Sequence, residues 1–414
     1  MFRIDIDRWE EIFLTITRNK TRSFLTAFGV FWGIFMLVAL MGGSQGIRGM
    51  MTSNFEGFAT NSGFTGSNQT SKAYKGFRKG RYWQLELKDV ERIQKSVPGI
   101  DILTPSNAQW GIKATYDKNQ KSCSMKGVYP EYAQIETPTL TMGRFINHID
   151  IKERRKVCVI GKEVYETLFP NGNNPCGTFI NVNGIYYQVI GVNTSAGNMS
   201  VNGWPPNTIT IPFTTMQQNY NFGNEIQLLC YTARPGYSIK DIQTRIEPIL
   251  KQAHMIHPED KQAILNVNAE ALFSMVDNLF KGIDILSWMV GLGTLLAGAI
   301  GVSNIMMVTV KERTTEIGIR RAIGAKPRDI MSQILSESMV LTTLAGMAGI
   351  SFAVFVLQIL EIGNAQSEMP AHFQISFWTA IGACVILLIL GMLAGLAPAY
   401  RAMAIKPIEA IRDE

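Results

Sequence analysis

A short, strongly basic segment lies between two long apolar runs near the C-terminal end of this 414-residue chain. The apolar runs cover about residues 279–310 and 330–359, and each exceeds the roughly 20 apolar residues that a membrane-spanning helix needs. The segment between them, residues 311–328, carries the basic side chains Lys311, Arg313, Arg320, Arg321, Lys326 and Arg328. Short loops this rich in lysine and arginine stay in the cytoplasm. The arrangement therefore predicts a helical membrane protein.

The composition supports a membrane protein that also has a large polar domain. Charged residues make up only 17% of the chain, against about 25% in a typical soluble domain. The mean hydropathy is nevertheless only +0.08, so the apolar residues are concentrated in part of the chain. The net charge of +6 does not indicate nucleic-acid binding, because the basic residues lie mainly beside the apolar runs.

The apolar runs and their basic flanks predict four transmembrane helices. Lys20 and Arg22 precede the first run and place the N-terminus inside, while residues 363–374 contain no lysine or arginine, as expected for an outside loop. In order we expect a cytoplasmic amphipathic helix over 1–22, spans over 23–41, 272–310 (with a stalk), 329–361 and 375–397, an extracytoplasmic domain over 42–271, a cytoplasmic segment over 311–328, an outside loop over 362–374 and a cytoplasmic tail over 398–414.

The polar domain contains patterns of both helices and strands. Asn183-Gly184 between apolar runs favours a two-residue hairpin turn, because both residues tolerate positive φ. Residues 52–80 resemble a loop, since they are rich in glycine, serine and asparagine. We expect helices over 85–96 and 239–252, the second broken or bent near Pro248, and strands over 100–103, 157–160, 178–182, 185–192, 208–213 and 226–232.

The basic segment itself has a helical pattern. Val310, Ile317, Ile319 and Ile323 are apolar among charges, and Gly324 is placed to end the helix. Glu316 and Arg320 lie four residues apart and can pair along it. We expect the charged side chains of this helix, including Arg313 and Glu316, to be solvated on the cytoplasmic surface.

The same segment, from Glu312 through Gly324 to Ala325, resembles the signature of MacB/FtsX-type ABC transporter permeases. Further resemblances lie at Gly143-Arg144-Phe145, at Val189-Ile190-Gly191-Val192 and at the closing patterns around Pro398 and Pro407. In that family this loop is a coupling helix that docks on an ATP-binding subunit. The resemblance therefore implies coupling roles for Glu312, Arg313, Glu316, Ile317, Gly318, Arg320, Arg321 and Gly324.

The resemblance implies a fold and a set of partners as well. The fold would have four transmembrane helices and a large extracytoplasmic α+β domain of two subdomains, one of them inserted and β-rich. The chain would be a permease of the bacterial inner membrane with both termini in the cytoplasm, and would couple ATP hydrolysis by a partner subunit to export of a substrate. Its partners would be an ABC ATPase, a second permease copy or paralogue, membrane lipids, and a periplasmic adaptor with an outer-membrane duct.

The chain shows no motif of an enzyme. It lacks the phosphate-binding Gly-x-x-x-x-Gly-Lys-Ser/Thr pattern, so ATP hydrolysis is assigned to another subunit and we expect no cofactor, catalytic residue or metal site here. His148, His254, His257 and His372 lie in no triad-like or HExxH pattern. Cys123, Cys158, Cys176 and Cys230 lie in the polar domain without metal-binding spacing, and buried unpaired thiols are favoured over a disulfide.

Small residues recur at a spacing of four in two of the spans. Gly293, Ala297 and Gly301 share a face of the second span, and Gly391 and Gly395 share a face of the fourth. Such spacing lets helices pack closely, which is favoured here over a substrate path. Glu337 and Glu361 are exceptional acids near span ends. The spans otherwise offer little polar lining for a pore.

Two other functions within the same family are open at this stage. An FtsX-like protein would transmit the motion to a cell-wall hydrolase, and a lipoprotein-releasing permease would take its cargo laterally between the spans. The size of the polar domain resembles that of MacB-like or lipoprotein-releasing proteins. Gene neighbourhood would discriminate, since an adaptor and duct indicate export and a hydrolase indicates regulation.

The topology is directly testable by cysteine labelling in intact cells. A cysteine at Asn183 should react with a membrane-impermeant maleimide, and one at Thr314 should react only after the membrane is opened. The expectation follows from the basic residues that hold the 311–328 segment inside. The reverse labelling pattern would overturn the proposed topology.

Overall fold

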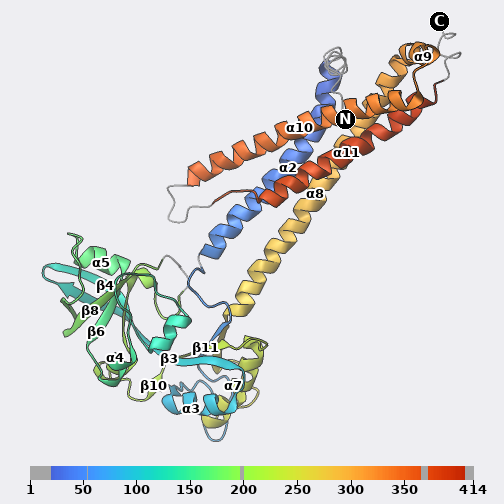
Figure 1. Ribbon diagram of the computed structural model, residues 1–414. Coiled ribbons are helices and arrows are strands. Elements are labelled where there is room, and N and C mark those ends of the chain that lie inside the picture. Colours follow the sequence, from blue (N-terminus) through green and yellow to red (C-terminus); the bar gives the residue numbers. More distant parts are fainter. Residues whose placement is uncertain (1–19, 54, 196–199, 365–371, 406–414) are drawn as a thin grey trace. The chain divides into compact units, whose positions relative to one another are not determined.

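The computed structural model describes residues 20–53, 55–195, 200–364 and 372–405 (Figure 1). The chain divides into a membrane unit, Met1–Met50 with Asn278–Glu414, and an outer unit, Met51–Asp277. Most of the helix predicted over 1–22, most of the loop predicted over 362–374 and the end of the predicted tail lie outside the described residues.

Within the described residues, four helices are long and apolar enough to cross a membrane, in agreement with the four predicted spans. They are α2 (Lys20–Ser53), α8 (Ala269–Glu312), α10 (Pro327–Asn364) and α11 (Phe377–Met403). A helix satisfies all its interior backbone hydrogen bonds within itself, which is why apolar runs of this length adopt it in lipid. With 44 residues and 1.5 Å per residue, α8 is roughly 66 Å long, about twice the hydrocarbon thickness.

Close contacts through small residues hold the membrane unit together. A Cβ atom at Gly298 of α8 would lie 3.0 Å from the backbone of Gly29 in α2, so a larger residue there would force the two helices slightly apart. On the other side of the bundle, Gly391 of α11 lies against Thr342 of α10, and the Ser338 hydroxyl donates to the Gly391 carbonyl at 2.8 Å. Gly395 lies against Ser338 in the same way.

The stripe of Gly293, Ala297 and Gly301 has a different environment. A Cβ atom at Gly293 or Gly301 would meet no other atom within 4 Å, and Ala297 is exposed. Within this chain α8 packs on α2 through Gly291 and Gly298 instead. Close packing at the predicted stripe stays a prediction, because no described residue packs closely against Gly293 or Gly301.

The outer unit is built on a mixed, mainly antiparallel sheet in the order β12-β1-β11-β3-β4-β9-β6-β8-β5, with β7 pairing β3 and β8. Its strands are β1 (Ser62–Ser67), β3 (Ile100–Tyr116), β4 (Asn119–Val128), β5 (Leu140–Gly143), β6 (Val157–Gly161), β7 (Phe179–Val182), β8 (Ile185–Asn193), β9 (Thr208–Pro212), β11 (Leu228–Ala233) and β12 (Ile264–Asn268). A separate ribbon pairs β2 (Leu85–Glu86) with β10 (Glu225–Ile226).

The described residues of the outer unit form three hydrophobic clusters, and two of them correspond to the predicted layout of two subdomains. Helices α3 (Leu87–Ser96) and α7 (Ile239–Ala253) bury Ile93, Ile242, Ile246 and Leu250 in one core. Strands β4, β6, β8 and β9, with the short helices α5 (Lys162–Leu168) and α6 (Phe213–Asn219), enclose the inserted, β-rich core. Strand β3 connects the two parts, because its first half pairs with β11 and its second half with β4.

The local predictions have mixed outcomes. The hairpin is confirmed, since Asn183 and Gly184 have φ of 48° and 88° and connect β7 to β8. The prediction of a loop over residues 52–80 is incomplete, because strand β1 lies there between β11 and β12. Glycine is required at position 63 of this strand, since a Cβ atom added there would lie 2.6 Å from the ring of Tyr231. The short strand expected over 100–103 is the start of β3, and the strand expected over 226–232 is divided between β10 and β11. Helix α7 is not broken at Pro248, whose ring lies on its exposed side.

A buried carboxylate fastens the loop before β2 to the rest of the outer unit. Asp260 accepts hydrogen bonds from the backbone N–H of Ser71 and Lys72 and from the Ser71 hydroxyl, and also from the N–H of Gln262 and Ala263. Its side chain is fully buried. Burial raises the pKa of this group, but the hydrogen bonds to the charged form outweigh burial and hold the pKa at about 2, against 3.8 ordinarily.

Replacing Asp260 with asparagine should therefore make the outer unit less stable by about 2 kcal/mol at neutral pH. A carboxylate whose pKa is lower in the folded state contributes stability above about pH 4, and this contribution is lost as the pH falls toward 2. Thermal unfolding of the purified full chain between pH 7 and 3 measures both effects. Asp101→Asn, on an exposed position of β3, is the matched control. Equal losses in the two variants would contradict the assignment.

Candidate functional site

The predicted helix of the basic segment is α9 (Thr314–Ala322), which lies between the end of α8 and the start of α10 (Figure 1). Its inward side chain is Ile317, which is 8% exposed. Ile317 packs in a small apolar cluster with Val310 of α8, Ile330 and Ile334 of α10, and Ala399 and Ala402 of α11. One short helix thus contacts three of the four long helices.

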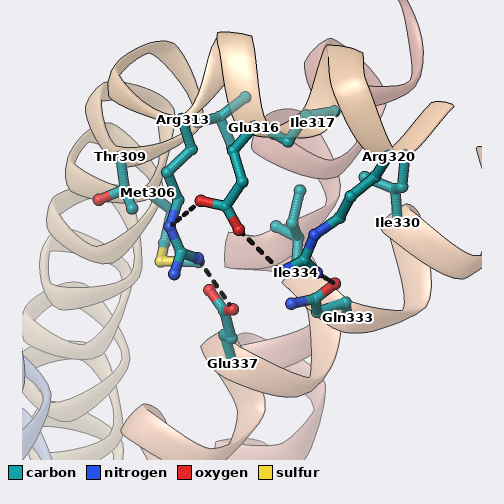
Figure 2. Close-up of a pocket in the computed structure, with 11 residues that line it drawn as sticks. Met306, Thr309, Arg313, Glu316, Ile317, Arg320, Ile330, Gln333, Ile334 and Glu337 are labelled. Carbon is teal, nitrogen blue, oxygen red and sulfur yellow. Dashed lines mark hydrogen bonds and ion pairs between the residues drawn. The ribbon is translucent and has the colours of Figure 1, made fainter. Parts of the chain in front are cut away.

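A chain of alternating charges runs beside this apolar cluster (Figure 2). The Arg313 guanidinium donates to Oε1 of Glu337 in α10 at 3.2 Å and lies 3.6 Å from Oε2 of Glu316. Glu316 accepts in turn from Arg320 at 2.8 Å, and Arg320 donates to the Gln333 side chain of α10 at 3.3 Å. The predicted pairing of Glu316 with Arg320 is confirmed, and it is one link in a longer network.

The expectation that the charges of this helix are solvated is wrong for Arg313. The Glu337 side chain is 6% exposed and that of Arg313 is 23% exposed, whereas Glu316 and Arg320 are 44% and 39% exposed. Arg313 is partly buried because the N-terminal part of α10 lies beside α9 and contacts its side chain through Glu337. A cavity of about 30 Å³ between these groups has room for about one water molecule.

Arg321 fastens α9 to the last span. Its guanidinium donates to the carbonyl of Met403, the last residue of α11, at 2.9 Å and to that of Ile405, two residues further on. The last carbonyls of a helix have no partner within the helix, and a positive charge there also interacts favourably with the helix dipole. Arg313, Arg320 and Arg321 therefore all bind elements of their own chain.

Gly324 ends α9 as predicted. It has φ of 111°, its N–H donates to the carbonyl of Arg321, and the N–H of Ala325 donates to that of Arg320. These two bonds form the Schellman motif, which favours glycine because a Cβ atom is strained at positive φ. Of the other predicted coupling residues, Gly318 is buried and Glu312 is exposed at the end of α8.

The outward side of α9 is apolar, which the sequence-based assignment of roles missed. Thr315, Ile319, Ala322 and Ile323 follow helical spacing and are all exposed, Ile319 by 46% and Ile323 by 82%. We call these four residues the outward face. The helical spacing of the apolar residues is visible in the sequence. The sequence does not show that Ile317 is buried while Ile319 and Ile323 are exposed, because this depends on the helices packed against α9. A helix with its charges engaged inward and isoleucines outward can bind an apolar surface of another protein.

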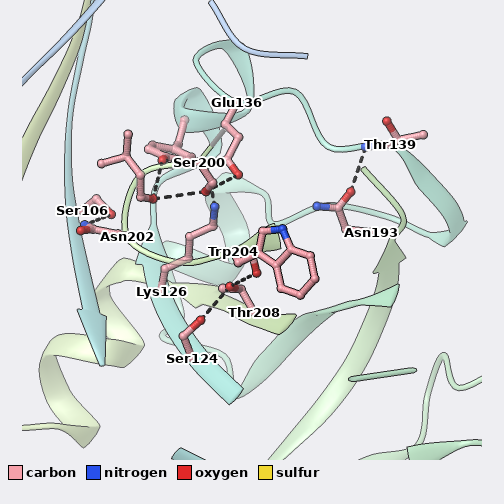
Figure 3. Close-up of polar contacts among 12 residues, drawn as sticks. Ser106, Ser124, Lys126, Glu136, Thr139, Asn193, Ser200, Asn202, Trp204 and Thr208 are labelled. Atoms are coloured by element: carbon pink, nitrogen blue, oxygen red, sulfur yellow. Dashed lines mark hydrogen bonds and ion pairs between the residues drawn. The ribbon is translucent and has the colours of Figure 1, made fainter. Parts of the chain in front are cut away.

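A second charged cluster lies inside the outer unit (Figure 3). Lys126 donates to Glu136 at 2.7 Å, and Glu136 also accepts from the hydroxyls of Tyr132 and Ser200, both at 2.9 Å. Lys126 and Glu136 are 5% and 8% exposed. These contacts connect β4 to the segments that follow it. The cluster has the properties of a structural brace.

The described residues contain no other arrangement suited to metal binding or thiol chemistry. No group of three or more histidine, cysteine or acidic side chains lies close enough to hold a metal ion among them. All five cysteines are described and unpaired, and Cys123, Cys158 and Cys230 are buried. Burial raises the pKa of the Cys123 thiol to about 12, so little of it is thiolate at neutral pH.

Comparison with known proteins identifies the family. A model of the MacB-like periplasmic core domain matches residues 23–249, and a model of the FtsX-like permease C-terminal domain matches residues 288–407. The first match alone covers more than half of the chain. The chain belongs to the permease family with a MacB-like periplasmic core domain. Helix α9 and its network thus lie within the FtsX-like part, and the outer unit lies mostly within the MacB-like part.

Relatives in this family include exporters that combine ATP-binding and permease functions in their names. The macrolide export ATP-binding/permease protein MacB of Bdellovibrio bacteriovorus is 27% identical, over 99% of this chain and 62% of its own length. The pyoverdine export ATP-binding/permease protein PvdT of Pseudomonas putida is 27% identical, over 96% of this chain and 58% of its own length. The chain therefore spans about three fifths of the length of these relatives.

Solved structures with similarity are of outer domains. The periplasmic region of MacB from Actinobacillus actinomycetemcomitans matches 54% of this chain at 18% identity, with a TM-score of 0.43. The extracellular domain of the noncanonic ABC-type transporter YknZ from Gram-positive bacteria matches 50% at 17% identity, with a TM-score of 0.41.

The Arg313–Glu337 pair predicts a selective loss of stability. Arg313→Gln leaves a buried carboxylate without its cation and should cost about 3 kcal/mol, whereas Arg320→Gln breaks an exposed pair and should cost less than about 1 kcal/mol. The double variant Arg313→Gln/Glu337→Gln should regain most of the loss. Thermal unfolding of the detergent-solubilised chain measures this, and equal destabilisation by the two arginine variants would refute the pairing.

Proposed function

We propose that this chain is the permease subunit of a MacB-like ABC exporter, and that a separate cytoplasmic subunit binds and hydrolyses ATP. The family matches support a permease, and both named relatives carry an ATP-binding function in addition. The absence of a phosphate-binding loop from the sequence agrees with this division of labour. We therefore assign no cofactor to this chain.

The observation that carries the proposal is the construction of α9. Its arginines and Ile317 engage α10 and α11, and its outward face presents Ile319 and Ile323 to the surroundings. The charge of the 311–328 segment supports a cytoplasmic location for this face. We infer that the outward face enters an apolar groove of the ATPase subunit and that the inward side passes the motion of that subunit to the spans.

The proposed transmission follows the contacts of α9. Movement of α9 displaces α10 through Arg313 and Glu337, and displaces α11 through Arg321. Helix α8 continues without interruption to Ala269, so a displacement of its cytoplasmic end reaches residues of the outer unit. In this proposal the outer unit changes conformation in response to ATP, and the spans act as transmitters instead of forming a pore.

The remaining partners follow from surfaces that this chain leaves uncovered. The exposed stripe of Gly293, Ala297 and Gly301 is suited to close packing with α8 of a second copy or of a paralogue. We propose an inner-membrane protein with cytoplasmic termini, in contact with membrane lipids and, on the outside, with a periplasmic adaptor and an outer-membrane duct.

Export is favoured over the two alternative functions by one observation. The relatives are named for export of macrolides and of pyoverdine, which are small molecules, and neither name refers to a hydrolase or a lipoprotein. We therefore propose that the cargo is a small molecule collected outside the hydrocarbon core. A cargo taken up from the outside also accounts for the scarcity of charged residues within the spans.

The outward face should be required for ATPase binding but not for folding. Ile319→Ser/Ile323→Ser removes two exposed isoleucines, so unfolding temperature and membrane level should stay normal, because exposed substitutions usually change stability by less than about 0.5 kcal/mol. Co-purification of the ATPase should fall at least about tenfold, since burying an isoleucine contributes about 1.5–3 kcal/mol.

The matched control is Ile149→Ser, which removes an isoleucine of 52% exposure from the outer unit and should leave ATPase binding unchanged. The permease purified without the ATPase should hydrolyse no ATP in either form. Normal ATPase binding by the double variant would show that α9 docks in another way or not at all. Turnover by the permease alone would contradict the assignment of ATP hydrolysis to a partner.

A further inference from the structure

The outer unit contains a cavity of about 350 Å³ that neither the family matches nor the proposed export mechanism explains. It lies between the exposed side of the second half of α7 and a tight turn at Tyr74 and Lys75. The volume falls within the range of about 300–1,000 Å³ that is usual for small-molecule sites. Its walls combine an apolar part with a few polar groups, which is the composition of such sites.

The turn that forms one wall is held in place before any ligand arrives. Tyr74 and Phe77 exchange both backbone hydrogen bonds, and Lys75 and Gly76 between them have φ of 43° and 84°. Asp260 fastens the same loop through Ser71 and Lys72. Positive φ in such a turn favours asparagine or glycine, so the lysine at position 75 is not explained by turn geometry.

The polar groups of the cavity favour an anion. Lys251 is 7% exposed and donates to Glu247 at 3.0 Å and to the Pro258 carbonyl at 3.1 Å. An ammonium has three N–H donors, so one remains for a ligand. The second oxygen of Glu247 accepts from Asn266 at 2.8 Å, so this carboxylate is already satisfied. With Lys75 also in the wall, the cavity has two cations and one neutralised acid.

The remaining walls favour a flat apolar body. The Tyr74 ring lies edge-on to that of His257 at 5.4 Å between centroids, and Ile256, Pro248 and Pro258 supply aliphatic surface. Thr244 also lines the cavity. Its carbonyl lacks the usual helical hydrogen bond from the residue four positions later, because that residue is Pro248, which has no N–H. A ligand could therefore combine a ring, a carboxylate and one hydrogen-bond donor.

We propose that this cavity is a binding site for a small aromatic carboxylate. The ring would pack between Tyr74 and the two prolines, and the carboxylate would accept from Lys75 and from the free N–H of Lys251. The site goes beyond the proposed export function, because it requires neither an ATPase partner nor a second copy. Its failure would leave that function untouched.

Two chemically matched probes test the site on the full chain in lipid nanodiscs. Naphthalene-2-carboxylate should bind saturably by isothermal titration, and naphthalene-2-carboxamide, which has the same ring without the charge, should bind at least about tenfold more weakly, because hydrogen bonds to ionised groups are about twice as strong as neutral ones. The amide also reports partition into lipid, which is not saturable. Equal affinity for the two probes would overturn the proposal.

Two variants should change the affinity in opposite directions, and a third serves as the control. Lys75→Gln should weaken binding of the carboxylate about tenfold, and Glu247→Gln should strengthen it several-fold, because the second removes the negative charge beside Lys251. Lys79→Gln makes the same charge change in the same loop outside the cavity and should leave affinity unchanged within about twofold, since screening by salt weakens distant charges. No saturable binding up to millimolar probe, or equal effects of the two lysine variants, would refute the site.

Discussion

The ion pair of Arg313 with Glu337 is the interaction on which the α9 end of the membrane unit depends. Helix α9 has only nine residues, which is shorter than the roughly 12–15 residues at which an isolated helix becomes even marginally stable in water. Its stability must therefore come from tertiary contacts: the burial of Ile317, the pairing of Arg313 with a nearly buried acid, and the bonds of Arg321 to the end of α11. If the ion pair is lost, the nearly buried carboxylate of Glu337 loses the cation that offsets part of its desolvation.

Predictions from the sequence succeeded where the signal is local. Apolar runs of sufficient length predicted four spans, Asn183-Gly184 predicted a hairpin, and Gly324 after a helical pattern predicted the end of α9. They failed where a distant segment decides. Glu337 lies 24 residues after Arg313 on another helix, and nothing in the pattern of either segment selects that partner. Strand β1 was missed because its glycines indicate a loop, whereas the Tyr231 ring on the neighbouring strand makes glycine necessary.

The distribution of side chains on α9 reverses what is usual at a water-facing surface. Charges normally face water, yet here three arginines are engaged by the chain itself and two isoleucines are left exposed. This reversal suits a helix that must do two things at once. Bonds between charged groups have defined directions and resist displacement, which suits them to the proposed transmission from α9 to α10 and α11. Apolar contact has no preferred direction, so it lets a partner bind and rotate on the outward face without breaking fixed bonds.

The same separation of rigid and exchangeable contacts is found in the outer unit. Asp260 accepts hydrogen bonds from the backbone of Ser71, 189 residues earlier in the chain, and from that of the nearby Gln262. It thereby connects the loop that carries the Tyr74 turn to the segment that follows α7. The cavity between the turn and α7 is consequently preformed, which lowers the entropy cost of ordering side chains on binding. Rigidity at this point also means that a ligand would bind tightly only while the turn and α7 keep their present separation. Any conformational change of the outer unit that alters this distance must change the affinity of the cavity, and by linkage a bound ligand must resist that change to the same extent.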